Sequence, residues 1–499
     1  MKTLRNVVLL SLLLLLSATG LFASQGFEVS FNQPVSSEYD LEFELGDYRL
    51  NETQKNGKMF TEIDFAGSVV TNKKGFAALP YIHASVQLSN DRNVTTEIIS
   101  TDYVEYSLNY PLLPSRGIIY RNQDPSTIPY EIADESIIDE FYPKDIAEAT
   151  EPFILRDIRG TNVYVYPFQY NAARNILRVY TNVIVKLIEN NTPVINPLIS
   201  AKRKVAREMN SLYKTVFINY DETRFEHELA DFGSILVIRT PRDIDAIAPY
   251  IQWKREKGFT VYEEEVVTGT NVISLVSSQY TAHNDILYVQ LVGDWADIQG
   301  PTAGGAAADP NLGCVVGGDI YMDLIVGRFS ANSTTHVTTQ VNKTITYERD
   351  PDMGADWYKA AVGIASSQGA GIGDDGEADY EHMNVIWNDK LDPFTYDTYT
   401  PIYDPSANAT MVANAVNAGT SIINYCGHGS MTSWVTSGFN NTHVNLLTNG
   451  DKLPFIISVA CVNGAFDDGE CFAEAWLKKD GAGAVGMFAG SINQTWAPP

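Results

Sequence analysis

The chain has 499 residues, of which 44% are hydrophobic and 19% charged, a composition that excludes a globally disordered or collagen-like protein. Its 61 acidic residues outnumber 35 basic ones, and the formal net charge of -26 argues against a nucleic-acid-binding protein. Most of this charge lies in 225–499, with a net of -21 against -5 in 1–224, so the C-terminal part favours cationic partners, cationic substrates or metal ions.

The first residues have the pattern of a secretory signal. Lys2 and Arg5 form a basic start, 7–16 are almost wholly apolar, and small residues follow. We predict cleavage near Ala23, which gives a signal peptide over 1–23 and a protein that is secreted or held at the cell surface. The apolar run is short for a membrane span, and no other segment approaches about 20 apolar residues, so we expect no stable span. An uncleaved anchor is the alternative interpretation.

Residues 25–190 are typical of a β-rich domain. Alternation of apolar and polar residues with period 2 predicts strands around 27–31, 81–86 and 163–170. Clusters of Asn, Asp and Pro between them indicate turns. No catalytic cluster is visible here, so we expect a sandwich or barrel.

Residues 190–230 connect the two halves of the chain. A basic stretch at 202–207 has a helical pattern, and the segment 219–224 is polar and expected to be exposed. Such a segment is a typical site for proteolytic cutting.

From residue 231 strands and helices alternate. Short, nearly continuous apolar runs predict buried strands at 234–238, 260–262, 286–292, 360–365, 421–425, 455–459 and 484–489. Helical patterns lie between several of them, at 243–257, 335–347 and 411–417. This alternation predicts an α/β domain with a mostly parallel sheet and helices on both faces. In such sheets, functional residues gather at the C-terminal ends of the strands.

Two of these strand ends carry the residues of cysteine chemistry. The run 421–425 leads into His428 between two glycines, and the run 455–459 leads into Cys461, 33 residues further on. If the strands are parallel neighbours, the thiol and the imidazole meet at one edge of the sheet, as a cysteine nucleophile and its base require. The main-chain N–H groups of Gly429 and Cys461 are candidates for holding the oxyanion.

Other interpretations of these residues stay open. A buried cysteine or a lone histidine more often serves packing or a local hydrogen bond than catalysis. Cys426 is a rival nucleophile, although it lies inside its strand end, and Cys471 is expected to pack on a helix over 472–477. A disulfide between Cys461 and Cys471 would exclude catalysis.

The same region resembles the gingipain-type cysteine peptidases of Bacteroidetes, in particular the arginine-specific gingipains. The resemblance rests on long segments around the two strand ends and beyond them: 425–430, 442–444, 446–449, 453–456, 459–464, 471–475 and 492–496. It covers 225–499 well and the β-rich half loosely.

The family implies a caspase-like α/β fold with Cys461 as nucleophile and His428 as its partner, and hence a cysteine endopeptidase. It also implies a secreted zymogen in which a β-rich propeptide over 24–224 inhibits a peptidase domain over 225–499. The family pattern places the activating cut after an arginine, and Arg224 followed by Phe225 fits. Family members continue past the position of Pro499, so we expect the peptidase domain to be C-terminally incomplete.

One position departs from the family pattern. The family has a glutamate that assists the histidine, and the matching residue is Gln368. Glutamine orients an imidazole but does not stabilise its charged form as a carboxylate does. Asp374 and Asp375 are candidates to replace it, and we expect activity to persist because the thiolate–imidazole pair contributes more.

The resemblance further implies structural calcium and no organic cofactor. Carboxylates and carbonyl oxygens suit this hard cation. The family correspondence points to the side chains of Asp294, Asp319, Glu377 and His382 and to carbonyls at Val316 and Tyr321. A solvated acidic surface is the alternative interpretation, and histidine is an unusual ligand for calcium.

Two further matches concern the residue before the cut bond, called P1. Asp379 corresponds to the aspartate that meets the P1 side chain, and Trp496 to the tryptophan that covers it. A guanidinium gains from both contacts, whereas lysine loses the bidentate geometry and much of the stacking. The expected substrates are therefore proteins and peptides cut after arginine, and less readily after lysine.

The leading interpretation of the whole chain is thus a secreted cysteine endopeptidase made as a zymogen. The alternative is a catalytically inactive, calcium-stabilised surface or binding protein on the same fold. Arg116 and Arg121 are candidates to occupy the active site in the zymogen, but we expect both to have a simple exposed role.

Overall fold

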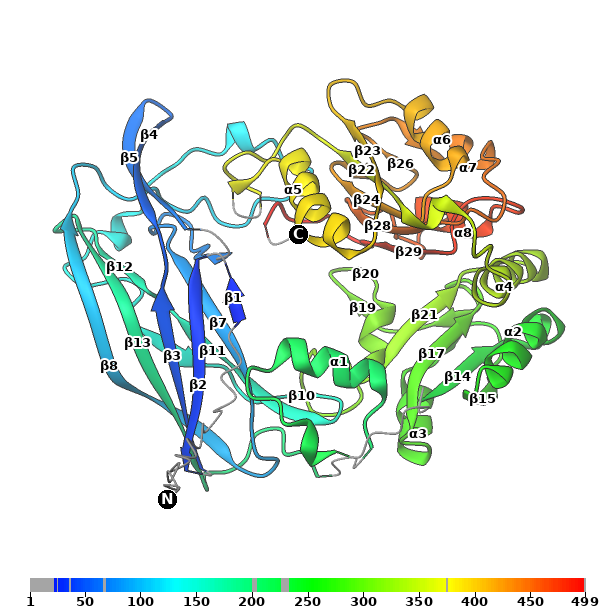
Figure 1. The fold of residues 1–499 in the computed structure, drawn as a ribbon, viewed down its shortest axis with the longest axis horizontal. Helices are drawn as coiled ribbons and strands as arrows, with labels where there is room; N and C mark the ends of the chain where they lie inside the picture. Colours follow the sequence, from blue (N-terminus) through cyan, green and yellow to red (C-terminus); the bar gives the residue numbers. More distant parts are fainter. Residues whose placement is uncertain are drawn as a thin grey trace, which may run out of the picture.

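The computed structural model divides the chain into a β-rich half and an α/β half (Figure 1). The residues it describes are 22–24, 26–35, 37–65, 69–199, 204–225, 233–373 and 376–497. Nearly all of the predicted signal peptide lies outside these ranges, so its cleavage stays a prediction. Within the ranges, no helix combines the length and the apolar composition that a membrane crossing requires.

The β-rich half is a sandwich of two antiparallel sheets. One sheet has the order β1 (Phe22–Ser24), β2 (Phe27–Val35), β3 (Glu38–Leu45), β13 (Ile176–Asn190) and β12 (Phe168–Asn171), with β8 (Asn93–Ser107) also paired to β13. The other has the order β10 (Phe153–Leu155), β11 (Ile158–Val165), β7 (Pro80–Gln87) and β6 (Val69–Val70), with β9 (Ala147–Ala149) paired to β11. A separate hairpin joins β4 (Arg49–Lys55) and β5 (Lys58–Asp64).

Alternating residues of both sheets form the shared core of this half. Leu41 and Phe43 from one sheet pack with Val86 and Val163 from the other, and all four are at most 2% exposed. The strand predicted over 163–170 is divided between the two sheets, because the chain leaves β11 before Pro167, which has no N–H to donate to a ladder.

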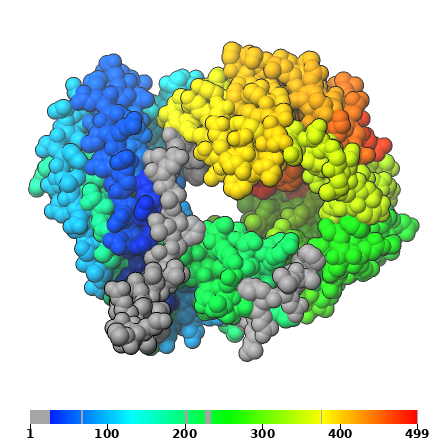
Figure 2. Space-filling view, in the orientation of Figure 1, coloured from blue at the N-terminus to red at the C-terminus, as the bar shows by residue number. Residues whose placement is uncertain are grey.

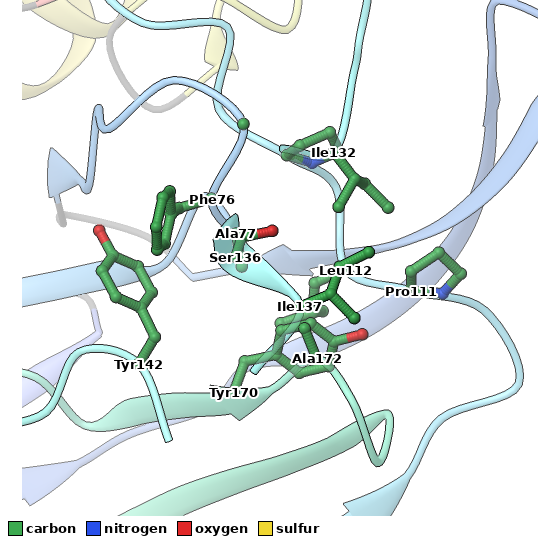
Figure 3. Close-up of a pocket in the computed structure, with 12 residues that line it drawn as sticks. Phe76, Ala77, Pro111, Leu112, Ile132, Ser136, Ile137, Tyr142, Tyr170 and Ala172 are labelled. Carbon is green, nitrogen blue, oxygen red and sulfur yellow. The ribbon is translucent and has the colours of Figure 1, made fainter. Parts of the chain in front are cut away.

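A pocket of about 210 Å³ opens within the β-rich half (Figure 3). Its lining is mainly apolar and includes Phe76, Leu112, Tyr142 and Tyr170. All of its lining residues lie between 75 and 172, so this pocket is separate from the strand ends that carry the candidate catalytic residues.

The connecting segment contains α1 (Arg207–Val216). The helical stretch predicted over 202–207 is therefore wrong in its bounds, because α1 begins where that stretch ends. The helix buries Met209 and Tyr213, which are four residues apart on one face, and these anchors lie after the basic run.

The α/β half contains two parallel sheets. The first has the order β15 (Thr260–Glu265), β14 (Ser234–Arg239), β17 (Ile286–Val292) and β21 (Ile325–Phe329). The second has the order β23 (Thr398–Tyr403), β22 (Ala360–Ala365), β24 (Ile422–Cys426), β28 (Phe455–Val459) and β29 (Gly486–Ala489). The predicted α/β class is confirmed, and each predicted strand has a counterpart.

Helices cover both faces of each sheet. On the first sheet, α2 (Ile244–Glu256) and α4 (Thr334–Arg349) lie on one face and α3 (Ile273–Ala282) on the other. On the second, α6 (Ala409–Ala418), α7 (Asn441–Asn445) and α8 (Phe472–Lys478) lie on one face and α5 (Asp379–Val385) on the other. Strands such as β14 are buried on both faces, which explains their continuous apolar sequences.

Among the residues that the structure describes, the two halves of the chain meet in two separate areas. In one, 119–121 of the β-rich half pair with 494–496. In the other, the hairpin of β10 and β11 contacts the loop 315–324. Figure 2 shows an opening through the molecule, with α5 above it in yellow and α1 below it in green.

Candidate active site

The candidate catalytic residues lie at the C-terminal edge of the second parallel sheet. In its register, Ala365 of β22 pairs with Cys426 of β24, and Cys426 pairs with Val459 of β28. His428 and Cys461 therefore each lie two residues beyond the same row of the sheet. This register brings the turns that bear the imidazole and the thiol to one edge, as the strand ends predicted.

The turns that carry His428 and Cys461 approach each other closely. A Cβ atom added to Gly429 would lie 2.4 Å from the carbonyl oxygen of Cys461 and 3.0 Å from its nitrogen, so a side chain does not fit there. Val462, the residue after the candidate nucleophile, has a φ of +50°, which is rare for a β-branched side chain. Its N–H donates to the carbonyl of Ile492 at 3.2 Å, which helps to hold this strained turn.

His428 has an amide, not a carboxylate, as its partner. Its Nε2 lies 3.0 Å from Oε1 of Gln368, which follows β22. The imidazole also meets the ring of Trp496 edge to face, with 5.7 Å between the centroids. The proposed substitutes Asp374 and Asp375 lie outside the described residues.

A buried carboxylate lies close to these residues. Asp379 is the first residue of α5 and is 3% exposed. Its Oδ2 accepts a hydrogen bond from Ser366 Oγ at 2.5 Å, and its N–H donates to the carbonyl of Gln368 at 2.8 Å. The Cys426 thiol lies 3.2 Å from Oδ1, and burial raises the pKa of this thiol to about 12, which keeps it neutral.

Arg121 of the β-rich half binds this carboxylate. Its Nη1 and Nη2 donate to the two oxygens of Asp379, each at 3.0 Å, and Nη2 also donates to Cys426 Sγ at 3.2 Å. Trp496 covers the guanidinium, with 4.5 Å between its central carbon and the ring centroid. The expected exposed role of Arg121 is therefore wrong: the residue is 2% exposed, because the bidentate pair and the indole compensate its desolvation.

The main chain beside Arg121 is bound as an added strand. Its N–H donates to the carbonyl of Gln494 at 2.8 Å, and the N–H of Trp496 donates to the carbonyl of Ile119 at 2.9 Å. The residues between them form an antiparallel bridge. Extended peptides bind to the edges of other chain segments in this way.

Arg116 is also not simply exposed. Its Nη1 donates to the carbonyls of Pro125 at 2.7 Å and Ile128 at 3.3 Å, and its guanidinium lies 4.3 Å from the ring centroid of Tyr130. It braces the loop 116–130, which presents Arg121.

All four cysteines are free, so Cys461 and Cys471 form no disulfide. Cys471 is buried at the start of α8, as expected, and burial raises the pKa of its thiol to about 12. Cys426 is the last residue of β24, and its thiol contacts Asp379 and Arg121. Its place in the arginine-binding pocket was not predicted.

Several residues that were expected to bind calcium contact other protein groups. Asp294 has its Oδ2 4.0 Å from the ammonium of Lys478, so a protein cation is already beside it. Glu377 pairs instead with Nδ1 of His382, with 3.0 Å between nitrogen and oxygen.

The remaining expected ligands lie in the loop that includes Val316. Asp319 accepts hydrogen bonds from the N–H of Tyr321 at 3.0 Å and the N–H of Ile154 at 2.9 Å. Within the described ranges, no group of three or more His, Cys, Asp or Glu side chains is arranged to hold a metal ion. Calcium binding by the six expected ligands stays a prediction.

The expected activation site is accessible on its propeptide side. Arg224 ends the short 3₁₀ turn Glu222–Arg224 and is exposed. Phe225 stacks on Tyr220 with 6.1 Å between the ring centroids. The cut between Arg224 and Phe225 itself stays a prediction.

Two family models match the chain. The model described as Peptidase family C25 matches residues 230–498, and the model Propeptide_C25 matches residues 30–226. Among curated proteins, Gingipain R2 of Porphyromonas gingivalis (strain ATCC 33277) is 36% identical over 472 residues, covering 92% of this chain and 64% of that protein. The chain thus spans less than two thirds of that relative's length.

Two solved structures are similar as well. The complex of Porphyromonas gingivalis RgpB pro- and mature domains has 37% sequence identity and a TM-score of 0.51, covering 53% of this chain and 65% of that one. The crystal structure of the Arg specific cysteine proteinase gingipain R (RGPB) has 38% identity and a TM-score of 0.52, covering 55% of this chain and 65% of that one.

Proposed function

Since the chain belongs to peptidase family C25, we propose that it is the zymogen of a secreted cysteine endopeptidase that cuts peptide bonds after arginine. The observation that carries this proposal is the placement of Arg121 between Asp379 and Trp496, at the sheet edge that bears the dyad. A guanidinium needs a carboxylate for its charge and a flat apolar surface for its face, and this pocket supplies both.

In the first half of the reaction, Cys461 becomes acylated. His428 takes the proton of the thiol, and the thiolate attacks the carbonyl carbon of the P1 residue. The N–H groups of Gly429 and Cys461 donate to the oxygen that becomes negative. The imidazolium then gives its proton to the departing amine, which leaves a thioester on the cysteine.

In the second half, water releases the product. His428 takes a proton from water, the oxygen attacks the thioester carbon, and the thiolate leaves and is protonated again. Gln368 orients the ring throughout, since its Oε1 accepts from Nε2–H at 3.0 Å and leaves Nδ1 as the base.

The pocket favours arginine over lysine. The two nitrogens of Arg121 that bind Asp379 lie in one plane, and the neutral Cys426 thiol accepts from the second of them. A lysine ammonium carries the charge but cannot make the paired contact or stack on Trp496 in the same way.

The propeptide acts as the inhibitor of this site. Arg121 fills the P1 position, so a substrate arginine cannot enter while the propeptide is docked. Similarity to a complex of pro- and mature domains supports this role. Activation then requires a cut, for which we propose the bond between Arg224 and Phe225, made by the enzyme itself or a related one.

Export and calcium binding rest on the sequence alone. The basic and apolar N-terminus supports secretion. For calcium, the test is the melting temperature of the mature domain before and after chelation. An unchanged melting temperature would contradict structural calcium.

Substrate kinetics test the proposed activity. The processed chain is given matched peptides whose reporter amide follows arginine, lysine or glutamine, with Cys461→Ala as the control. We expect hydrolysis after arginine to exceed that after lysine at least about tenfold in kcat/KM, since one lost charged contact costs more than about 1.4 kcal/mol. No hydrolysis by a folded, processed chain would overturn the proposal.

A further inference from the structure

The propeptide makes a second arginine contact, on the far side of the opening from α5 (Figures 1 and 2). There the turn between β10 and β11 carries Arg156, whose φ is +52° and whose side chain is 5% exposed. Its N–H donates to Oδ1 of Asp323 at 2.9 Å, and its Nη1 donates to the carbonyl of Asp323 at 2.7 Å. Its guanidinium lies 5.8 Å from the ring centroid of Tyr280.

The peptidase half supplies a rigid receiving group for this turn. Asp323 is 1% exposed, and its Oδ2 accepts hydrogen bonds from the N–H groups of Val315 at 2.9 Å and Val316 at 2.8 Å. These bonds orient the carboxylate so that Oδ1 meets the N–H of Arg156.

Contacts on both strands of the hairpin set its position. Phe153 of β10 stacks on Tyr321, with 3.8 Å between the centroids and 13° between the planes. The N–H of Ile154 donates to Asp319 Oδ2 at 2.9 Å, and Asn162 of β11 donates to the Tyr321 hydroxyl at 2.8 Å. The surface therefore matches a β-hairpin backbone as well as the arginine at its turn.

We propose that these peptidase residues form an exosite, a docking site separate from the catalytic pocket, for a β-hairpin with arginine at its turn. We call it the hairpin socket and define it by Tyr280, Val315, Val316, Asp319, Tyr321 and Asp323. Its occupant in the zymogen is the propeptide hairpin, which it holds after the activating cut and independently of Arg121. The inference rests on the proposed function, because it treats the β-rich half as a propeptide.

The activating cut leaves the hairpin socket intact. The hairpin residues precede Arg224 and the socket residues follow Phe225, so no contact between them depends on that bond. The apolar cluster beside the hairpin also spans the cut, since Phe153 and Phe217 pack there with Leu287 of β17.

Propeptide retention tests this proposal without requiring catalysis. All variants are made in the full chain with Cys461→Ala, cut in the exposed segment at Arg224 by a small amount of trypsin, and analysed by size-exclusion chromatography over a dilution series. Arg156→Asn removes the guanidinium while asparagine tolerates the left-handed backbone. Arg174→Asn is the matched control, because Arg174 lies in another propeptide turn and pairs with Asp139.

We expect Arg121→Ala to leave the cut propeptide bound to the peptidase domain. Arg156→Asn should weaken retention of the propeptide at least tenfold relative to Arg174→Asn. The double variant, which combines Arg121→Ala with Arg156→Asn, should release the propeptide. Equal retention in Arg156→Asn and Arg174→Asn, or full release by Arg121→Ala alone, would overturn the inference.

A peptide measurement covers the case in which Arg156→Asn impairs folding. A cyclised hairpin with the sequence of 152–161 is titrated by fluorescence anisotropy into the peptidase domain released from the double variant. We expect binding that is lost when Arg156 of the peptide is replaced by asparagine, and equal binding of both peptides would contradict the socket. Because every protein carries Cys461→Ala, a failure of the proposed peptidase activity would appear only in the kinetic test.

Discussion

Asp379 is the residue that we propose to select the P1 side chain, because it is 3% exposed and binds both terminal nitrogens of Arg121. Asp379→Asn leaves a buried guanidinium without its counter-charge. We expect kcat/KM on arginyl substrates to fall by roughly 30- to 5000-fold, about 2–5 kcal/mol, as for other truncated buried charge pairs. Asp389→Asn, at an exposed position after α5, is the control, and an Asp379→Asn enzyme with unchanged kcat/KM would refute the assignment.

Gln368 sets how well the imidazolium is stabilised. A carboxylate 3.0 Å from Nε2, as in Gln368→Glu, would favour the charged ring more than the amide does. We expect the alkaline limb of the rate profile to move upward by as much as about one pH unit, with kcat increased several-fold. Gln368→Ala should lower kcat without moving the alkaline limb of the pH–rate profile upward. Identical pH–rate profiles of Gln368→Glu and the native enzyme would contradict the role of Gln368 as the partner of His428.

The sequence was sufficient to predict that the turns of His428 and Cys461 meet at one sheet edge, but not which residues fill or line the neighbouring pocket. His428 and Cys461 each follow a continuous apolar strand, so parallel pairing alone brings their turns together. Arg121 lies in an irregular polar loop with no periodic pattern, and its burial depends on a partner 258 residues away. Asp379 and Trp496 were predicted only through the family resemblance, because their place in the pocket also depends on contacts with residues far away in the sequence.

The contact between α4 and α8 links the two parallel sheets through one buried lysine. Lys343 of α4 donates to the carbonyls of Trp476 and Leu477 in the last turn of α8, each at 3.0 Å, and burial lowers the pKa of Lys343 to about 7. Lys343→Met leaves these carbonyls without their donor, and we expect the free energy of unfolding to fall by about 1–3 kcal/mol. Urea denaturation measures this, with Lys359→Met at an exposed ion pair as the control.

The same lysine predicts a pH dependence with a definite sign. Between its folded pKa of about 7 and the ordinary value of 10.5, the unfolded chain holds more protons at this position than the folded one. The stability of the native protein relative to Lys343→Met should therefore increase as pH rises from 7 to 9. If the difference in the free energy of unfolding between the native protein and Lys343→Met stays constant or shrinks from pH 7 to 9, the burial of an uncharged amine is contradicted.

Continuous apolar runs predicted the central strands well, whereas two of the four edge strands in the parallel sheets, β21 and β23, escaped prediction. β17, β22 and β28 have the predicted bounds, because each lies inside its sheet and has a nearly continuous apolar sequence. β21 and β23 lie at sheet edges, where one contains Gly327 and Arg328 and the other contains Pro401, so neither has a continuous apolar run. Strand pairing is a long-range property, and for this reason the division into two sheets was not visible in the sequence.

In the proposed function, the whole molecule is a peptidase half docked to its propeptide at two arginines. Arg121 lies between Asp379 and Trp496, whereas Arg156 lies in the hairpin socket. In a full chain made resistant to cutting by Arg224→Gln, Arg121→Ala should hydrolyse small arginyl substrates at least about tenfold faster than its parent, because the P1 site becomes free. Arg174→Ala is the control. If Arg121→Ala hydrolyses the substrate no faster than its parent, the latency of the uncut chain has another cause.

The most direct measurement is covalent labelling of Cys461 by a peptidyl arginyl acyloxymethyl ketone, followed by mass spectrometry. The account predicts one label on Cys461 in the processed chain, slow labelling of the uncut chain, and no label after Cys461→Ala or prior alkylation. It also predicts that a lysyl analogue reacts more slowly. A folded, processed chain that takes up no label, or takes it up on Cys426, would contradict the assignment of this molecule as a cysteine peptidase with nucleophile Cys461.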